Sequence, residues 1–150
     1  MRRRPGRPGR RGRGRRPPLA GRRAAVPPRV RRALQRARRR LDTGRYEDAA
    51  AIYERLADRA YERDRMRAGV QMDLEATRAW LRAENLTAAQ GRALHALDAL
   101  LDRGQLPRVV MPTVACIASA MEAQGRLEDA TEFRAQVDAR LEAHQADLDT

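Results

Sequence analysis

The chain contains few residues of the kinds that bind metals or act as nucleophiles. His95 and His144 are the two histidines, Cys116 is the single cysteine, and Ser119 is the single serine. A zinc site needs several convergent ligands, usually from closely spaced Cys or His pairs, and the sequence contains no such pair. It also lacks the Glu-x-x-His pair of di-iron helical bundles. We therefore expect no metal site and no cofactor.

Covalent catalysis is also poorly supported. All 32 basic residues are Arg, so every mechanism that needs a lysine amine is excluded, including Schiff bases, phosphate-binding lysine loops and Ser-Lys pairs. Ser119 and Cys116 lie in a nearly apolar segment, Val114–Met121, where both are expected to be small packing residues and Cys116 to be buried. The composition predicts a protein that is not an enzyme.

The charges divide the chain into a basic tail and an acidic body. Residues 1–40 carry 18 Arg and no acid, whereas residues 41–150 carry 14 Arg and all 20 acidic residues. Residues 1–28 are rich in Arg, Gly and Pro and lack bulky apolar side chains, so we expect this tail to be disordered. Its Arg-Gly runs resemble arginine-glycine-rich RNA-binding tails, although they lack interleaved aromatics.

Two interpretations of the tail stay open. In the first, guanidinium groups contact polyanions without sequence preference. In the second, the tail is a passive charged segment or an over-extended start. The residues proposed for polyanion contact are Arg2, Arg3, Arg4, Arg10, Arg11, Arg13, Arg15 and Arg16.

The sequence gives no sign of export or membrane insertion. The longest uncharged stretch, Val109–Met121, has 13 residues and contains Pro112, whereas a membrane helix needs about 20 apolar residues. No apolar run follows the basic N-terminal residues as in a secretory signal. A single cysteine forms no internal disulfide, so a cytoplasmic location is the expectation.

From residue 29 onward the periodicity predicts an all-α body. Apolar residues recur at intervals of three and four, and Ala, Leu, Arg and Glu are the best helix formers. Six helices are expected, with Thr87 and Gln90 forming a capping box at the start of the fourth. They group into three antiparallel hairpins spanning about residues 29–60, 64–103 and 108–146 of one domain, 29–150.

The hairpins are related by an internal repeat. The turn residues Gly44, Glu84 and Gly125 fall in register, 40 and 41 residues apart. A small residue follows five positions after each turn, and a fixed period in this range is typical of stacked helical repeats. The small residue would let the second helix of each hairpin cross the first at close range.

These residues resemble the tetratricopeptide repeat family. In that pattern a Gly is followed by an aromatic or apolar residue, then a small residue, then an aromatic, as at Gly44, Tyr46, Ala49 and Tyr53. The other hairpins supply Ala89, Gly125, Leu127 and Ala130, with Glu84 in place of Gly and Phe133 one position early. The period exceeds the family's 34 residues, which implies longer helices or longer connections near residues 58–64 and 104–110.

The resemblance implies a short α-solenoid that serves as a protein-protein interaction scaffold, with the tail as a tether. Family members hold a peptide on the surface formed by the first helix of each hairpin, which here would favour an acidic partner. The matching positions are Arg31, Leu34, Arg38, Gln71, Leu74, Arg78, Arg82 and Ser119, with Ala115 and Glu122 beside Ser119. These Arg residues can equally be ordinary solvated helix faces.

Other assignments stay open at this stage. Trp80 and Tyr61 are either partner anchors or core residues. Because three repeats are near the minimum for stability, self-association, for example as a homodimer, is a further expectation. The alternative function is a nucleic-acid-associated protein that binds RNA or DNA through the tail and uses the helices for dimerisation or recruitment. The net charge of −6 on residues 41–150 indicates that the body itself does not bind nucleic acid.

Overall fold

The computed structural model describes residues 25–150, and every regular element in that range is helical. This confirms the predicted all-α class for the described residues. The predictions for the tail, including its disorder and its eight polyanion-contact arginines, fall mainly on residues 1–24 and lie outside the described range. The elements are α1 (Pro28–Asp42), α2 (Tyr46–Glu62), α3 (Met66–Arg82), α4 (Leu86–Asp102), the 3₁₀ turn η1 (Pro107–Val109), α5 (Met111–Ala123) and α6 (Leu127–Leu148).

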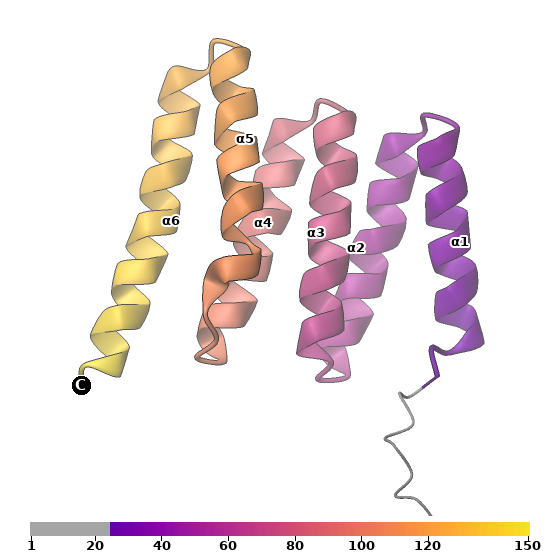
Figure 1. Cartoon of the computed structure of the whole chain (residues 1–150), viewed down its shortest axis with the longest axis horizontal. Coiled ribbons are helices and arrows are strands. Elements are labelled where there is room, and N and C mark those ends of the chain that lie inside the picture. Colours follow the sequence, from indigo (N-terminus) through magenta and orange to yellow (C-terminus); the bar gives the residue numbers. More distant parts are fainter. Residues whose placement is uncertain (1–24) are drawn as a thin grey trace, which may run out of the picture.

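The helices form a stack in which each one is an antiparallel neighbour of the next (Figure 1). The helices α1, α3 and α5 lie in the front layer of Figure 1, and α2 and α4 lie behind them. Helix α4 also contacts α6. The first and last helices therefore lie at opposite ends of the stack, and each has an outer side without a helical neighbour in the described chain.

Left-handed residues make the sharp turns between helices. Gly44, Gly104 and Gly125 have φ of 75°, 63° and 76°, and Asp64 and Glu84 reach the same region with φ of 57° and 58°. At each turn the next amide donates to a carbonyl five residues back, which satisfies the free end of the helix. The turns recur after about 20 residues, so the connection between hairpins after α2 is as short as the turn within a hairpin.

The predicted column of small residues is buried as close packing requires. Ala49, Ala89 and Ala130 are fully buried, each in the first turn of its helix. Gly69 takes the same place in α3, where a Cβ would lie 2.5 Å from Cε1 of Tyr61. Small side chains at this position therefore let the end of one helix pack on the start of the next.

The core is formed by two groups of buried side chains. One lies between α1, α2 and α3 and includes Ala37, Tyr53 and Leu56. The other extends from α3 to α6 and includes Leu97 and Phe133, which are both fully buried. Phe133 thus fills the core although it lies one residue before the family's aromatic position. None of the helices in residues 25–150 is long and apolar enough to cross a membrane.

The predicted cap of the fourth helix was wrong, and of the two alternatives near residues 58–64 the structure shows the longer helix. Helix α4 begins at Leu86 and is capped by Asn85, whose side chain accepts the Ala88 amide at 3.1 Å, so Thr87 is not the cap. Asn85 is the cap because it directly follows the left-handed turn residue, and its side chain can reach the free amides of the first helical turn. No long connection exists near residues 58–64, because α2 continues to Glu62. The longer connection near residues 104–110 is present and contains η1.

Candidate functional site

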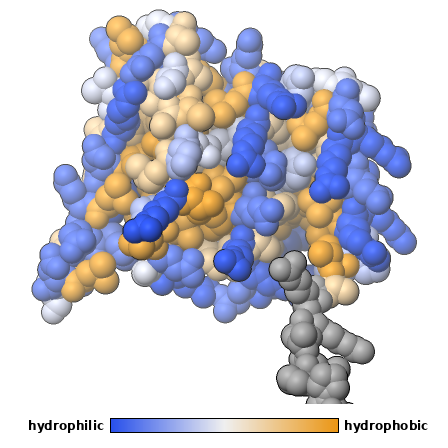
Figure 2. Space-filling model, viewed as in Figure 1, coloured by the Kyte–Doolittle hydropathy of each residue, from blue (hydrophilic) through white to orange (hydrophobic). Residues whose placement is uncertain are grey.

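The surface positions suggested by the repeat resemblance lie on α1, α3 and α5, the front layer of the stack. We call the exposed members of this set the odd-helix face; they are Arg31, Arg38, Gln71, Arg78, Arg82 and Ser119. In Figure 2, strongly hydrophilic side chains gather over α1 and α3, with hydrophobic patches between them. Leu34 is only half-buried, but Leu74 is 4% exposed and packs in the core, so its assignment to a groove surface was wrong. Leu74 faces inward because its helical stripe joins the core side of α3.

Charged residues from two helices act on the buried side chain of Tyr53 in α2. Burial raises the pKa of Tyr53, Glu75 of α3 raises it further, and Arg38 of α1 lowers it. Glu75 also accepts a hydrogen bond from Arg78 at 2.7 Å. The negative charge of Glu75 is therefore already paired within α3.

The arginines of this face differ in how much of their charge is already matched. Arg78 pairs with Glu75, and the Arg82 guanidinium lies 5.9 Å from the centroid of the Tyr46 ring. Among the seven arginines of α1, only Arg40 has a carboxylate oxygen within 4.0 Å in the described residues, that of Asp48 at 3.8 Å. Arg31 and Arg38 are thus the members most available to an acidic partner.

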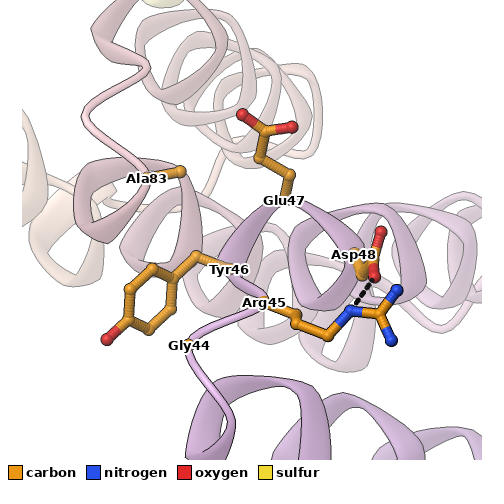
Figure 3. A pocket seen from close by; sticks show the side chains of 6 residues that line it. All are labelled: Gly44, Arg45, Tyr46, Glu47, Asp48 and Ala83. Atoms are coloured by element: carbon orange, nitrogen blue, oxygen red, sulfur yellow. Dashed lines mark ion pairs between the residues drawn. The ribbon is translucent and has the colours of Figure 1, made fainter.

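A shallow hollow of about 400 Å³ lies between the turn at Gly44, which joins α1 to α2, and the end of α3 (Figure 3). Tyr46 points away from the chain on one side of the hollow, and Arg45 pairs with Asp48 at 2.9 Å on the other. Ala83 completes the lining from the end of α3. The repeat-signature residue Tyr46 is therefore half-exposed, and it differs in this from the buried Tyr53.

Beneath the surface, a fully buried carboxylate joins three helices. Oδ2 of Asp73 in α3 accepts a hydrogen bond from the Tyr61 hydroxyl of α2 at 2.7 Å and lies 2.7 Å from Nδ1 of His95 in α4. Oδ1 of Asp73 lies 2.6 Å from Nη2 of Arg92, which also donates to Asp58 at 3.0 Å. We call Asp58, Tyr61, Asp73, Arg92 and His95 the Asp73 cluster.

The electrostatics of the Asp73 cluster favour a neutral tyrosine and a charged arginine. Burial and the hydrogen bond to Asp73 raise the pKa of Tyr61 well above its usual value, because the phenolate would be desolvated beside a carboxylate. Burial lowers the pKa of Arg92, but the carboxylates of Asp73 and Asp58 outweigh it and raise that pKa overall. The buried charge of Asp73 is thus balanced by Arg92.

The cluster sets the packing of α2, α3 and α4. The Tyr61 ring lies against Gly69 and meets the His95 ring edge to face, with ring centroids 5.1 Å apart. Beside the cluster, Nε1 of Trp80 donates to Glu54 at 2.6 Å. Trp80 and Tyr61 are therefore both engaged inside the protein, as the core interpretation predicted, rather than presented as free anchors.

A carboxylate at Nδ1 of a histidine is also the arrangement that orients a general base. The side chain of His95 is 47% exposed. It does not line the hollow beside Gly44 and Ala83, the hollow between α1 and α2 or the hollow between α4 and α6. Within residues 25–150, no three His, Cys, Asp or Glu side chains are grouped so that they could hold a metal ion. The polar groups of the cluster already contact one another, and this arrangement supports a structural role.

The Asp73 cluster was not predicted from the sequence, although the sequence contains a signal for it. In the 20-residue register, Asp73 aligns with Tyr53 and Ala93, which are both buried. An acidic residue at a core position requires a partner from another helix.

The remaining predicted residues are placed as follows. Gly44 and Gly125 are left-handed turn residues, and Leu127 is 63% exposed. Cys116 and Ser119 are both exposed, so the prediction that they pack in the core was wrong. Helix α5 is apolar on nearly every side, but only the side carrying Val114, Ile117 and Met121 meets the other helices.

Comparisons of the chain with protein-family models, with curated proteins and with solved structures find no match in any of the three.

Proposed function

We propose that this protein is a non-enzymatic interaction scaffold of the tetratricopeptide type that binds an acidic segment of a partner protein on its odd-helix face. The observation that carries the proposal is the set of exposed α1 arginines that lack carboxylate partners within residues 25–150. Guanidinium groups in this state form strong bidentate contacts with carboxylates. The repeated turns and the buried alanine column support the assignment to this type of repeat.

The proposal is tested by the affinity of the full chain for a fluorescent peptide rich in Glu and Leu. The substitutions Arg31→Gln and Arg38→Gln together should weaken binding about tenfold or more, since losing one charge-assisted hydrogen bond costs at least about 1.5 kcal/mol. The control combines Arg59→Gln with Arg63→Gln, which removes the same charge from exposed positions at the end of α2. Equal weakening by both pairs would contradict a specific face.

A second candidate function is non-specific binding of nucleic acid through the arginines of residues 1–40, where no acidic residue occurs. In this case the affinity for single-stranded RNA should fall steeply with salt, because each neutralised phosphate releases counterions. Replacing Arg2, Arg3, Arg4, Arg10 and Arg11 by Gln should then weaken RNA binding and leave peptide binding unchanged. A strong preference for one RNA sequence would contradict this function.

A further inference from the structure

The charge of the described residues is divided between the two ends of the stack. Residues 25–67 contain 13 Arg and 7 acidic residues, whereas residues 68–150 contain 8 Arg and 13 acidic residues. The two regions therefore carry net charges of +6 and −5. Because α1 and α6 lie at opposite ends, this division makes one end of the molecule basic and the other acidic (Figure 1).

The acidic end has an open groove of about 540 Å³ between α4 and α6. Its charged lining includes Asp98, Asp102, Asp147 and Arg140, and Arg140 pairs with Asp98 at 2.7 Å. Apolar surface is provided by Leu148, which is 64% exposed, whereas Leu101 lies buried at the base of the lining. We call this hollow the acidic groove.

Helix α6 leaves this groove uncovered because its C-terminal half has little to pack against. The helix has 22 residues, but its fully buried side chains, Ala130, Phe133 and Val137, all lie in the first half. No further helix within the described chain follows to cover the other half. An exposed leucine beside unpaired carboxylates suits a partner that is both apolar and cationic.

The basic end has a groove of similar size, about 420 Å³, between α1 and α2. Its charged lining is formed by Arg36, Arg40, Arg45 and Arg55 with the single acid Asp48, and its apolar lining by Ala51 and Ile52. In the described residues Arg36 and Arg55 have no carboxylate within 4.0 Å, and both are exposed. We call this region the basic edge.

We propose that the protein associates head to tail, with the acidic groove of one copy receiving the basic edge of a second copy. The two ends of the molecule have opposite charges, and the lining of each includes apolar side chains beside its charged groups. Complementary charge of this kind sets the orientation of an interface. Contacts between two different surfaces of one protein leave a free surface at each end, so short open stacks form instead of closed dimers.

The proposal is tested by sedimentation velocity of the full chain at increasing concentration, at low and high salt. One variant carries Asp102→Arg and Asp147→Arg in the acidic groove, and the other carries Arg36→Glu and Arg55→Glu on the basic edge. All four positions are exposed, so both variants should keep the helical circular-dichroism spectrum of the wild type. The matched control is Glu128→Arg with Glu132→Arg, exposed positions on α6 outside the groove.

The expected result is specific to a head-to-tail contact. Each variant alone should associate roughly tenfold or more weakly than the wild type, because like charges then face each other. An equimolar mixture of the two variants should form stacks again, because each contact between unlike copies joins opposite charges, either the native pair of surfaces or the pair in which both charges are reversed. The variant with all four substitutions should associate again, since both charges are reversed, and high salt should weaken every form of association.

Three outcomes would overturn the proposal. The first is a wild type that stays monomeric at all concentrations. The second is association that is lost only in the acidic-groove variant, which would show that another segment, such as the arginines of residues 1–24, occupies the groove. The third is an equal loss of association in the control variant, which would show that association depends on net charge alone.

Discussion

Replacing Asp73 by Asn should destabilise the folded protein strongly, because this side chain is fully buried and serves three partners. The substitution keeps the volume of the side chain and an oxygen for the Tyr61 hydroxyl. It removes the charge that balances Arg92 at 2.6 Å, and because Tyr61 and His95 share Oδ2, it places the amide NH2 group at Oδ1, against Arg92. Breaking a buried ion pair by changing one partner costs about 3–5 kcal/mol.

The structure favours the lower end of that range. Arg92 would still donate to Asp58 at 3.0 Å, and the Asp58 side chain is 54% exposed and so remains solvated. We therefore expect a loss of about 3 kcal/mol in the free energy of unfolding, which corresponds to a fall in Tm of roughly 10 °C for a domain of this size.

The assay is urea unfolding followed by circular dichroism at neutral pH. The control is Asp98→Asn, the same chemical change at an ion pair of 2.7 Å whose carboxylate side chain is 48% exposed. The control should cost less than about 1 kcal/mol. In an Arg92→Gln background, the penalty for Asp73→Asn should shrink, because the charge that needs balancing is gone. Similar losses for Asp73→Asn and Asp98→Asn would refute the reasoning that burial makes this carboxylate costly to replace.

Five other outcomes follow from single features. In the same urea assay, Gly69→Ala should lower the free energy of unfolding by about 1–3 kcal/mol, because the new Cβ would lie 2.5 Å from the Tyr61 ring. Gly91→Ala should raise the free energy of unfolding by about 0.5–1 kcal/mol, because the position in α4 has open space around it and alanine is the better helix former. Glu84→Gly should raise the free energy of unfolding by about 1 kcal/mol, since φ is 58° there; a lower value would contradict the strain. The pKa of Tyr61 is raised on folding from its usual value of 10.0, so its contribution to stability is complete below about pH 10 and is lost at higher pH; Tyr61→Phe should flatten that decline in alkaline unfolding titrations. Cys116 should react with a thiol reagent in the folded protein as fast as in urea, and protection in the fold would contradict its exposed position.

Features that depend on residues close together in the chain could be predicted from the sequence alone. Helices follow from apolar residues three and four positions apart, and Gly44 and Gly125 mark turns because glycine enters the left-handed region without steric cost. The column of Ala49, Ala89 and Ala130 was visible as a repeat, since each small residue stands at the same distance from its turn. These are local constraints, and they are readable without knowing how the helices pack.

The contacts between side chains of different helices depend on how the helices pack, and they could not be predicted from the sequence. Asp73 and Arg92 are 19 residues apart, and their pairing depends on the crossing and rotation of α3 against α4, which no local pattern specifies. The packing of α5 against α4 and α6 likewise leaves Cys116 exposed on an almost uniformly apolar helix, where periodicity cannot say which side is covered. The opposite charges of the basic edge and the acidic groove also depend on the stack, because it places α1 and α6 at opposite ends of the molecule.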